Sequence, residues 1–259
     1  MDDLAPFESS KLVIARAEEH LRDFKAEARA FLQGCTYAVV RRIDEEAGEQ
    51  VLSYRFDERI PPRLRLLSSE IVAGCKHALD QAASDAAIAT GRPNAKGVHF
   101  PIGASSADFQ NEIKRRLRNV RPEIIAFIEK LQTYYGGNTA LYKFLSLAGV
   151  GKHQRILRIF LDDVGVVLTF DPRVPMFIPG PFKIAKFGWN DARNEVDFLR
   201  APLDKEYAAD FRPALQIVLG DGEPPLGGPA ATVFKDMVGE CERIILGLEA
   251  EAARIRTAP

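Results

Sequence analysis

The sequence predicts an α+β protein with a mainly helical first part (residues 1–153), an inserted β-hairpin (36–56), an antiparallel sheet (154–220) and a long C-terminal helix (228–256). Apolar residues in the first part recur at three- and four-residue spacing, which is the period of an amphipathic helix. The pattern then changes to the alternating or continuous apolar runs of strands, and helical spacing returns at the end. This order is typical of a single α+β domain, and 259 residues suffice to bury its core.

The first helix is predicted over residues 9–33, where Ser9 or Ser10 can cap its start and Gly34 ends it. The runs TYAVVRRI and VLSYRF then lie on either side of the acidic stretch DEEAGEQ. Both runs are rich in β-branched and aromatic residues, so they predict the two strands of a hairpin with an exposed loop.

The longest helix of the first part is predicted from Leu64 to Ala86, because apolar residues step by three or four positions along one face. Gly91 and Pro93 stop it. Its Ala-rich end would let another helix approach closely, so a homodimer through this helix is one partner arrangement to consider.

Three shorter helices are predicted next. Ser105 and Asp108 form a capping-box variant at the start of the first, Pro122 suits the first turn of the second, and Asn138 can cap the third, which is expected to run to about Ala148. Five strand segments follow, and their short links favour antiparallel pairing: RILRIFL (155–161) and VGVVLTF (164–170) around a DD turn, FKIAKF (182–187), NEVDFLR (194–200) and ALQIVLG (214–220).

The composition predicts a soluble globular protein, with 46% hydrophobic and 27% charged residues. The net charge of −1 provides no global attraction to nucleic acid or to an anionic membrane, so a nucleic-acid site would have to be a local basic patch. The first residues, MDDLAPFESS, carry two acids and no apolar run, which argues against a secretory signal. We therefore expect a cytoplasmic location and no membrane partner.

Cysteine and histidine spacing predicts neither a disulfide framework nor a metal site. The three cysteines lie far apart in sequence, and Cys75 and Cys241 fall on apolar helical stripes as core thiols. The four histidines share no local ligand spacing such as H-x-x-x-H. No G-x-S-x-G nucleophile motif occurs, and we expect no cofactor.

The stretch GVGKHQ, which begins at Gly149, contains the Gly-Lys of a phosphate-binding loop. The full motif also requires a first glycine where Ser146 stands and a Ser or Thr where His153 stands. A helix precedes the stretch and a strand follows it, which is the reverse of a phosphate loop. We interpret it as a helix end, in which Gly149 and Gly151 leave the helix and Lys152 and His153 lie near the negative end of its dipole.

The middle of the long helix, GCKHALDQ, carries polar residues three or four positions apart. His77 and Asp80 would form an oriented acid–base pair if the carboxylate fixes the tautomer of the imidazole. The alternative, which we favour, is an exposed helix face with a Lys76–Asp80 ion pair.

The stretch KRRLRNVR (114–121) is the main basic segment. Lys114, Arg115, Arg116 and Arg118 would bind RNA phosphates in a nucleic-acid site. No aromatic residue is interleaved for base stacking, so a solvated helix end is the favoured interpretation.

Four stretches together resemble a widespread group of uncharacterised bacterial proteins of similar length. In that group a long helix carries a motif close to N-L-R-S-A-L-D-H, followed by a loop with F-P-I, a segment like I-x-x-L-Q-P-Y-x-G-G-N, and D-K-H-R before a sheet. This chain has, in the same order, GCKHALDQ (74–81), HFPI (99–102), IEKLQTYYGGN (128–138) and GKHQ (151–154). The resemblance covers residues 60–160.

The R-S-A-L-D-H motif of that group is similar to the Arg–His pattern of HEPN-type helical ribonucleases and RNA-binding bundles. The resemblance therefore implies RNA binding or ribonuclease activity, in phage defence or a toxin system. In such enzymes a cation stabilises phosphate charge while an imidazole moves a proton. This chain departs from the pattern, because Lys76 replaces the Arg, Gln81 replaces the His, and Gly151 and Gln154 replace the Asp and Arg of the second motif.

Two functions follow from these observations. The substitutions favour a non-catalytic binding or scaffold protein, since Gln cannot transfer a proton at neutral pH. The alternative is a HEPN-like RNA-binding protein or ribonuclease, in which His77, Asp80, Lys152 and His153 are catalytic and Lys76 binds the substrate. The enzyme requires that His77 face His153 across a concave, electropositive pocket.

Overall fold

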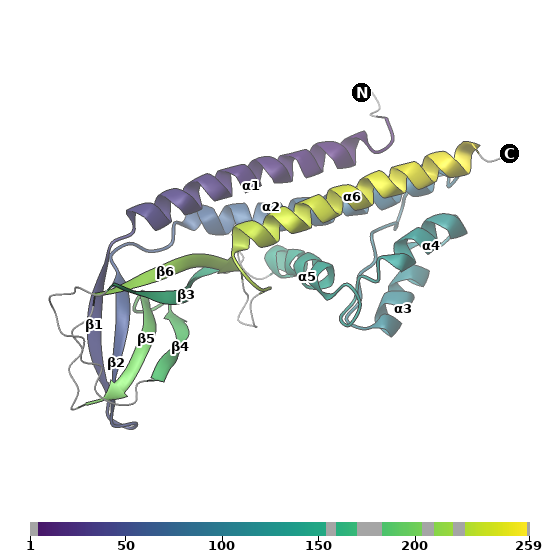
Figure 1. The fold of residues 1–259 in the computed structure, drawn as a ribbon. Helices are drawn as coiled ribbons and strands as arrows, with labels where there is room; N and C mark the ends of the chain where they lie inside the picture. Colours follow the sequence, from purple (N-terminus) through teal and green to yellow (C-terminus); the bar gives the residue numbers. More distant parts are fainter. Residues whose placement is uncertain (1–4, 154–158, 170–182, 204–209, 220–225, 258–259) are drawn as a thin grey trace. The chain divides into compact units, whose positions relative to one another are not determined.

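The predicted α+β class is confirmed by the structure, a computed structural model that describes residues 5–153, 159–169, 183–203, 210–219 and 226–257 (Figure 1). The chain divides into two compact units. The first contains described residues within 1–25, 65–157 and 226–259, and the second those within 26–64 and 158–225. The prediction of a single domain stays a prediction.

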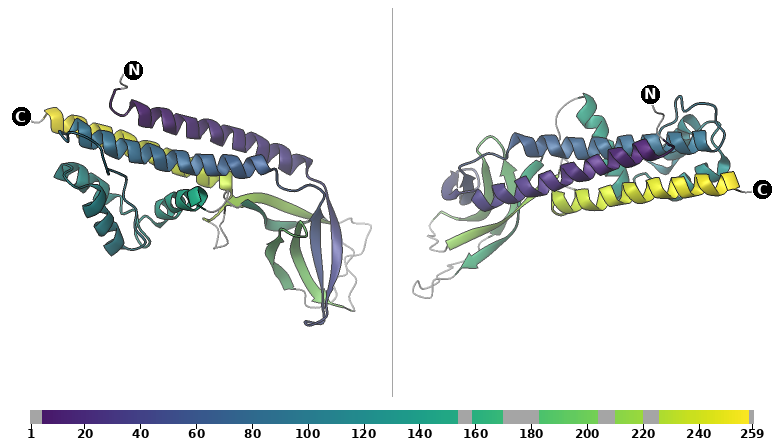
Figure 2. Two further views of the ribbon diagram at one scale, coloured as in Figure 1. Left: turned by 180° about the vertical axis from the view of Figure 1, so that it is seen from behind. Right: turned by 90° about the horizontal axis from the view of Figure 1, so that it is seen from above.

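The first unit is built from helices. They are α1 (Glu8–Gly34, which enters the second unit after Lys25), α2 (Pro62–Ala89, which joins the first unit at Arg65), α3 (Ser106–Arg116), α4 (Pro122–Lys130), α5 (Thr139–His153) and α6 (Ala230–Thr257). Helices α1, α2 and α6 run side by side in every view (Figures 1 and 2).

Aromatic rings and small residues hold these helices together. The Phe24 ring of α1 meets the Phe234 ring of α6 edge-on with centroids 5.1 Å apart, and Phe144 of α5 packs against the same ring. Cys75 and Cys241 are fully buried where α2 contacts α6, which confirms the prediction of core thiols. The Ala-rich end of α2 is also buried within the chain, so it offers no free face to a second copy.

Several predicted helix boundaries are confirmed. The Ser105 hydroxyl accepts a hydrogen bond from the Asp108 backbone N–H at 3.1 Å, and Asn138 Oδ1 accepts one from the Leu141 backbone N–H. Helix α1, however, begins before Ser9 and Ser10, so neither residue caps it from outside. The Ser10 hydroxyl instead donates to the Phe7 carbonyl oxygen at 2.9 Å.

The predicted end of α5 was wrong. The helix continues through Gly149 and Gly151 to His153. Glycine lowers helix stability by about 1 kcal/mol relative to Ala without forbidding helical geometry. The GVGKH segment is therefore the last turn of a helix rather than an exit from it.

The second unit contains the strands. They are β1 (Tyr37–Asp44), β2 (Glu49–Phe56), β3 (Ile159–Thr169), β4 (Lys183–Asn190), β5 (Glu195–Pro202) and β6 (Asp210–Leu219). The pairings between these strands in the described residues are antiparallel, as predicted. The predicted hairpin β1–β2 is not separate from the later strands, because β2 pairs with β5 in a four-stranded sheet of order β1-β2-β5-β4.

The predicted turn at Asp162 and Asp163 was also wrong. Both residues lie inside the single strand β3, which pairs along its length with β6 and carries only a register shift after Asp163. The backbone continues through the two aspartates as one strand because both positions have partners in β6. Residues 155–158 of the predicted strand lie outside the described residues.

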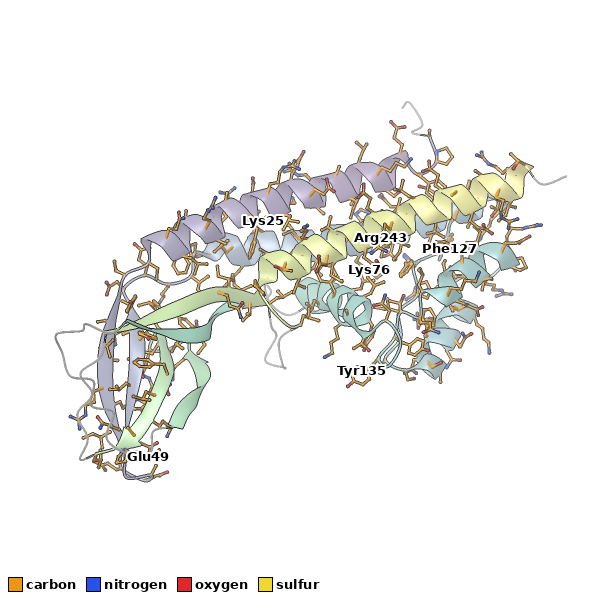
Figure 3. All side chains as sticks on the ribbon, in the orientation of Figure 1. Lys25, Glu49, Lys76, Phe127, Tyr135 and Arg243 are labelled. Atoms are coloured by element: carbon orange, nitrogen blue, oxygen red, sulfur yellow. The ribbon has the colours of Figure 1, made fainter. Side chains whose placement is uncertain are left out.

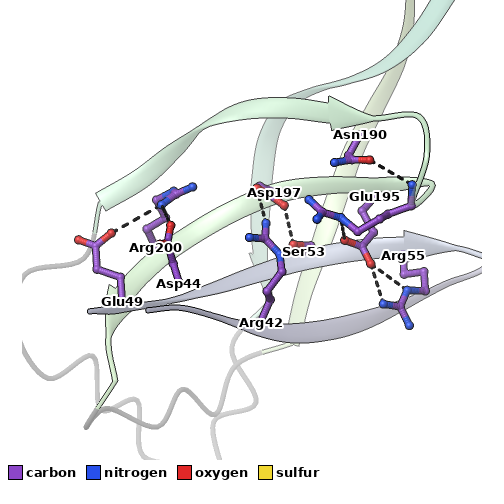
Figure 4. A network of polar contacts seen from close by, with 10 residues as sticks. Arg42, Asp44, Glu49, Ser53, Arg55, Asn190, Glu195, Asp197 and Arg200 are labelled. Atoms are coloured by element: carbon purple, nitrogen blue, oxygen red, sulfur yellow. Dashed lines mark hydrogen bonds and ion pairs between the residues drawn. The ribbon is translucent and has the colours of Figure 1, made fainter. Parts of the chain in front are cut away.

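One face of the four-stranded sheet carries a network of charges (Figure 4). Glu195 of β5 is only 2% exposed, and its carboxylate accepts two hydrogen bonds from Arg55 and lies 3.1 Å from Arg193 Nε. Asp197 of the same strand accepts hydrogen bonds from Arg42 and from the Ser53 hydroxyl. The buried carboxylate of Glu195 and the part-buried carboxylate of Asp197 are thus both paired, which offsets the cost of removing their charge from water.

Candidate functional site

A cleft of about 530 Å³ lies in the first unit between α2, the loop 99–102, α3 and α5. We call it the α2 cleft. Its lining combines charged, imidazole and apolar side chains: Ala73, Lys76, His77, Asp80, His99, Phe100, Ile102, Glu112, Arg116, Leu145, Ser146, Ala148 and Gly149. Three residues that the sequence singled out, Lys76, His77 and Asp80, therefore share one cavity. Lys76 is labelled on α2 in Figure 3.

Asp80 is the polar centre of the cleft. Its Oδ1 accepts a hydrogen bond from the Phe100 backbone N–H at 2.8 Å and another from the Lys76 ammonium. Lys76 Nζ also lies 3.4 Å from the Phe100 carbonyl oxygen. The Asp80 carboxylate therefore binds both Lys76 of the same helix and the loop that forms the opposite wall of the cleft. The predicted Lys76–Asp80 ion pair is present, but it is partly buried in a cleft rather than on an exposed face.

The two imidazoles of the cleft have different partners. His77 Nε2 lies 3.0 Å from Gln81 Nε2, and Gln81 in turn accepts a hydrogen bond from Ser9. Asp80 instead lies near His99, with 3.8 Å between Asp80 Oδ2 and His99 Nδ1. The structure thus brings His99 rather than His77 close to Asp80, although the two groups are too far apart for a hydrogen bond. His99 is 48% exposed in its side chain, so its ring is open to a ligand.

A second ion-pair cluster closes the α3 side of the cleft. Glu112 accepts hydrogen bonds from Arg115 and Arg116. Partial burial by itself raises the pKa of Glu112, but the two guanidinium hydrogen bonds together outweigh burial and hold that pKa below its usual range. Glu112 is therefore a carboxylate at neutral pH, and it neutralises the Arg116 that faces the cleft.

Small residues and local hydrogen bonds position the loop wall. The Ser84 hydroxyl lies within hydrogen-bond distance of the Val98 carbonyl oxygen, and the Gly103 N–H donates to the Thr133 carbonyl oxygen at 3.1 Å. A Cβ atom at Gly103 would lie 2.3 Å from the Phe109 backbone nitrogen, so only glycine fits there. These contacts fix the path of residues 99–102 along α2.

The basic segment 114–121 is largely neutralised by its own neighbours. Arg115 and Arg116 pair with Glu112, and Arg121 pairs with Glu123. Lys114 and Arg118 have no ion pair within the described part of the chain. Of the four predicted RNA contacts in this segment, only Arg116 lines the α2 cleft.

The proposed meeting of His77 and His153 stays a prediction. Helix α5 reaches His153, but the side chains of Lys152 and His153 lie outside the described residues. Sequence reasoning missed His99 and Glu112. The HFPI stretch (99–102) was a signal that could have indicated His99. This loop packs against the long helix α2, and His99, its first residue, lies beside Asp80.

Neither a metal centre nor a membrane span is found in the described residues. No three His, Cys, Asp or Glu side chains within them come together in a group that could hold a metal ion. No helix in the same residues is both long enough and apolar enough to cross a membrane.

Comparisons of the chain with protein-family models, with curated proteins and with solved structures found no match. The resemblance to the bacterial group and to HEPN proteins therefore stays a prediction.

Proposed function

We propose that this protein is a cytoplasmic binding protein whose ligand occupies the α2 cleft, without a chemical step. The observation that carries the proposal is the charge balance of the lining. Lys76 pairs with Asp80, and Arg116 pairs with Glu112, so the two fixed cations are matched by two carboxylates. A cleft of this kind exerts no net pull on a polyanion.

The ligand that suits such a lining is a small neutral or zwitterionic molecule with an apolar side group. The volume of about 530 Å³ falls within the usual range for small-molecule sites. Phe100, Ile102 and Leu145 provide an apolar wall, while the neighbouring opposite charges complement a molecule that carries both signs. His77 and Ser146 add groups that can hydrogen-bond a neutral ligand.

A ligand panel tests this proposal. Phenylalanine, N-acetylphenylalanine amide, phenylacetate and phenethylamine have a similar apolar body and differ mainly in charge, and saturation-transfer NMR measures their binding. We expect the zwitterion and the neutral amide to bind, and the singly charged compounds to bind at least about fivefold more weakly, because each would leave a cleft charge mismatched.

Matched variants locate the binding. Ala73→Trp places an indole in the α2 cleft and should abolish the signal, whereas Ala126→Trp, on an exposed position of α4, should leave it unchanged. A panel in which phenylacetate binds best, or binding that Ala73→Trp does not affect, would contradict the proposal.

The HEPN-like ribonuclease remains the second candidate, because one observation favours it. Two imidazoles, His77 and His99, line the same cleft as Lys76, and this combination can supply an acid, a base and a cation to a phosphodiester. Incubation of the purified protein with labelled total RNA tests it, beside a His77→Ala/His99→Ala double variant.

The control for that experiment is His20→Ala, because His20 lies near Glu70 and does not line the cleft. Degradation that the double variant loses and His20→Ala retains would establish the ribonuclease and overturn the non-catalytic proposal. Equal background degradation by all three proteins is the result that the binding proposal requires.

A further inference from the structure

A second cavity of the first unit lies between the end of α2 and the turn that joins α3 to α4. Its volume is also about 530 Å³, and it shares no lining residue with the α2 cleft. Residues 90–94 form one side and residues 119–122 form the other. We call it the Arg92 pocket.

The charge of this pocket differs from that of the α2 cleft. Its lining contains two arginines, Arg92 and Arg121, and two asparagines, and it contains no Asp or Glu. Arg121 is paired with Glu123 at 2.8 Å. Arg92 has no carboxylate partner anywhere in the described residues. The pocket therefore carries a guanidinium without a counter-ion, which favours an anionic occupant.

The guanidinium of Arg92 is also incompletely hydrogen-bonded. Its Nη2 donates to the Lys96 carbonyl oxygen at 3.0 Å, while its Nη1 is buried without an acceptor in the described part of the chain. A buried donor that lacks an acceptor is unfavourable. Rotation of this side chain toward an anion in the pocket would give that donor an acceptor.

Neutral donors complete the lining. Asn94 Oδ1 accepts a hydrogen bond from the Lys96 backbone N–H, which leaves the Asn94 amide group to donate. Asn119 adopts a left-handed backbone conformation with φ of 62° and makes no side-chain hydrogen bond within the described residues. Two guanidinium groups with two side-chain amides around one cavity provide the donors that the oxygens of a phosphate group accept.

We propose that the Arg92 pocket binds the terminal phosphate of a phosphate monoester, with Arg92 as its main cation and Arg121 as its second. The dianionic phosphate suits two guanidinium groups better than a single carboxylate does. The cavity exceeds the size of a bare phosphate ion, so a sugar or nucleoside attached to the phosphate also fits. This site is independent of the function proposed for the α2 cleft.

Glu123 is the internal competitor for this ligand. Its carboxylate accepts hydrogen bonds from its own backbone N–H and from Arg121, and both interactions hold the pKa of Glu123 below its usual range. An incoming phosphate must share Arg121 with this carboxylate. Removing the charge of Glu123 should therefore strengthen binding.

The test is isothermal titration with ribose 5-phosphate, with ribose as the uncharged control and chloride as the background anion. We expect saturable one-to-one binding of ribose 5-phosphate alone. Arg92→Gln should weaken it by at least about tenfold, since charge-assisted hydrogen bonds are lost. Arg121→Gln should weaken it by a smaller factor, and Glu123→Gln should strengthen it by up to about fivefold.

Arg118→Gln is the matched control. It removes the same charge three residues before Arg121, from an exposed side chain that does not line the pocket, and should leave the affinity unchanged. Because Arg121 is exposed, its variant keeps the test valid even if Arg92→Gln fails to fold. Absence of binding at 10 mM ligand, on the order of the weakest specific affinities, or equal losses in the Arg118 and Arg121 variants would overturn the proposal.

A second arm identifies the source of the phosphate. Short RNA with and without a 5′-phosphate is titrated under the same conditions. Binding that requires the 5′-phosphate and the Arg92 guanidinium supports the pocket with a nucleic-acid end as its ligand. If both RNAs bind equally and Arg92→Gln does not change their binding, the Arg92 pocket is not the site of contact with RNA. That result would count against the 5′-phosphate of RNA as the ligand of the pocket.

Discussion

Replacing Asp80 should release the loop 99–102 from α2. The Asp80 carboxylate is the acceptor for the Phe100 backbone N–H at 2.8 Å, and the same oxygen binds the Lys76 ammonium. Asp80→Ala removes that acceptor without filling the space, whereas Asp80→Asn retains an amide oxygen and removes only the charge. The two variants therefore separate the hydrogen bond from the ion pair.

The expected magnitudes follow from these contacts. A hydrogen bond to a charged group contributes about 1.5–3 kcal/mol, and a neutral one contributes about 1 kcal/mol. The Asp80 side chain is 24% exposed, so solvent screens it only in part. We expect Asp80→Ala to lower the free energy of opening of the loop by about 2 kcal/mol, and Asp80→Asn by about 1 kcal/mol. These values correspond to roughly 30-fold and fivefold larger equilibrium constants for local opening, and to equally faster exchange of the Phe100 amide.

The assay is hydrogen exchange of the Phe100 amide, measured by NMR under conditions in which exchange reports the opening equilibrium. The control is Asp85→Asn on the same helix, because Asp85 accepts a hydrogen bond from the Phe7 backbone N–H at 3.0 Å. That variant should change exchange at Phe7 and leave Phe100 unaffected. Unchanged exchange of Phe100 in Asp80→Ala would refute the assignment of Asp80 as the anchor of the cleft wall.

Three further predictions concern the fold. Gly103→Ala should lower the free energy of unfolding by about 3 kcal/mol, because the added Cβ would meet the backbone of Phe109. Gly149→Ala should raise it by up to about 1 kcal/mol, because nothing lies within 4 Å of the added Cβ and alanine favours the helix. Urea denaturation measures both changes. Glu195→Ala should cost about 2 kcal/mol in the same assay, because alanine cannot accept the charge-assisted hydrogen bonds of Arg55, and a loss below about 1 kcal/mol would contradict this. Burial and nearby carboxylates raise the pKa of the Cys35 thiol to about 11. The rate of its alkylation by iodoacetamide should therefore rise about tenfold per pH unit between pH 7 and 10. A plateau of this rate near pH 9 would be evidence against the raised pKa.

The helices were predictable because their determinants are local. Apolar spacing, the cap at Ser105 and the cap at Asn138 act over one or two turns, so the residues that specify them are adjacent in sequence. The prediction failed at Gly149 and Gly151 for a physical reason. Glycine is a weak helix former rather than an obligatory stop, and neither residue adopts a positive φ that would break the helix.

Strand order and the turn at Asp162 could not be derived in the same way. A hairpin can be inferred from adjacent strands, but the pairing of β2 with β5 joins segments more than a hundred residues apart. Two acidic residues in a row are typical of a turn, yet here the partner strand β6 continues past them. Pairing depends on which strand lies alongside, and no local pattern contains that information.

The α2 cleft likewise has a part that local spacing predicts and a part that depends on contacts between distant segments. Asp80 lies four residues after Lys76, about one helical turn along α2, so this spacing alone predicted the ion pair between them. The imidazole that lies near Asp80 across the cleft is that of His99, which comes from a loop about twenty residues later. Its position depends on how that loop packs against α2. The sequence by itself determined the fold class, the helices and the polar face of α2. Only the tertiary structure decided which side chains lie opposite the polar face of α2. Those side chains come from the loop 99–102, α3 and α5, and their positions depend on how these segments pack against α2.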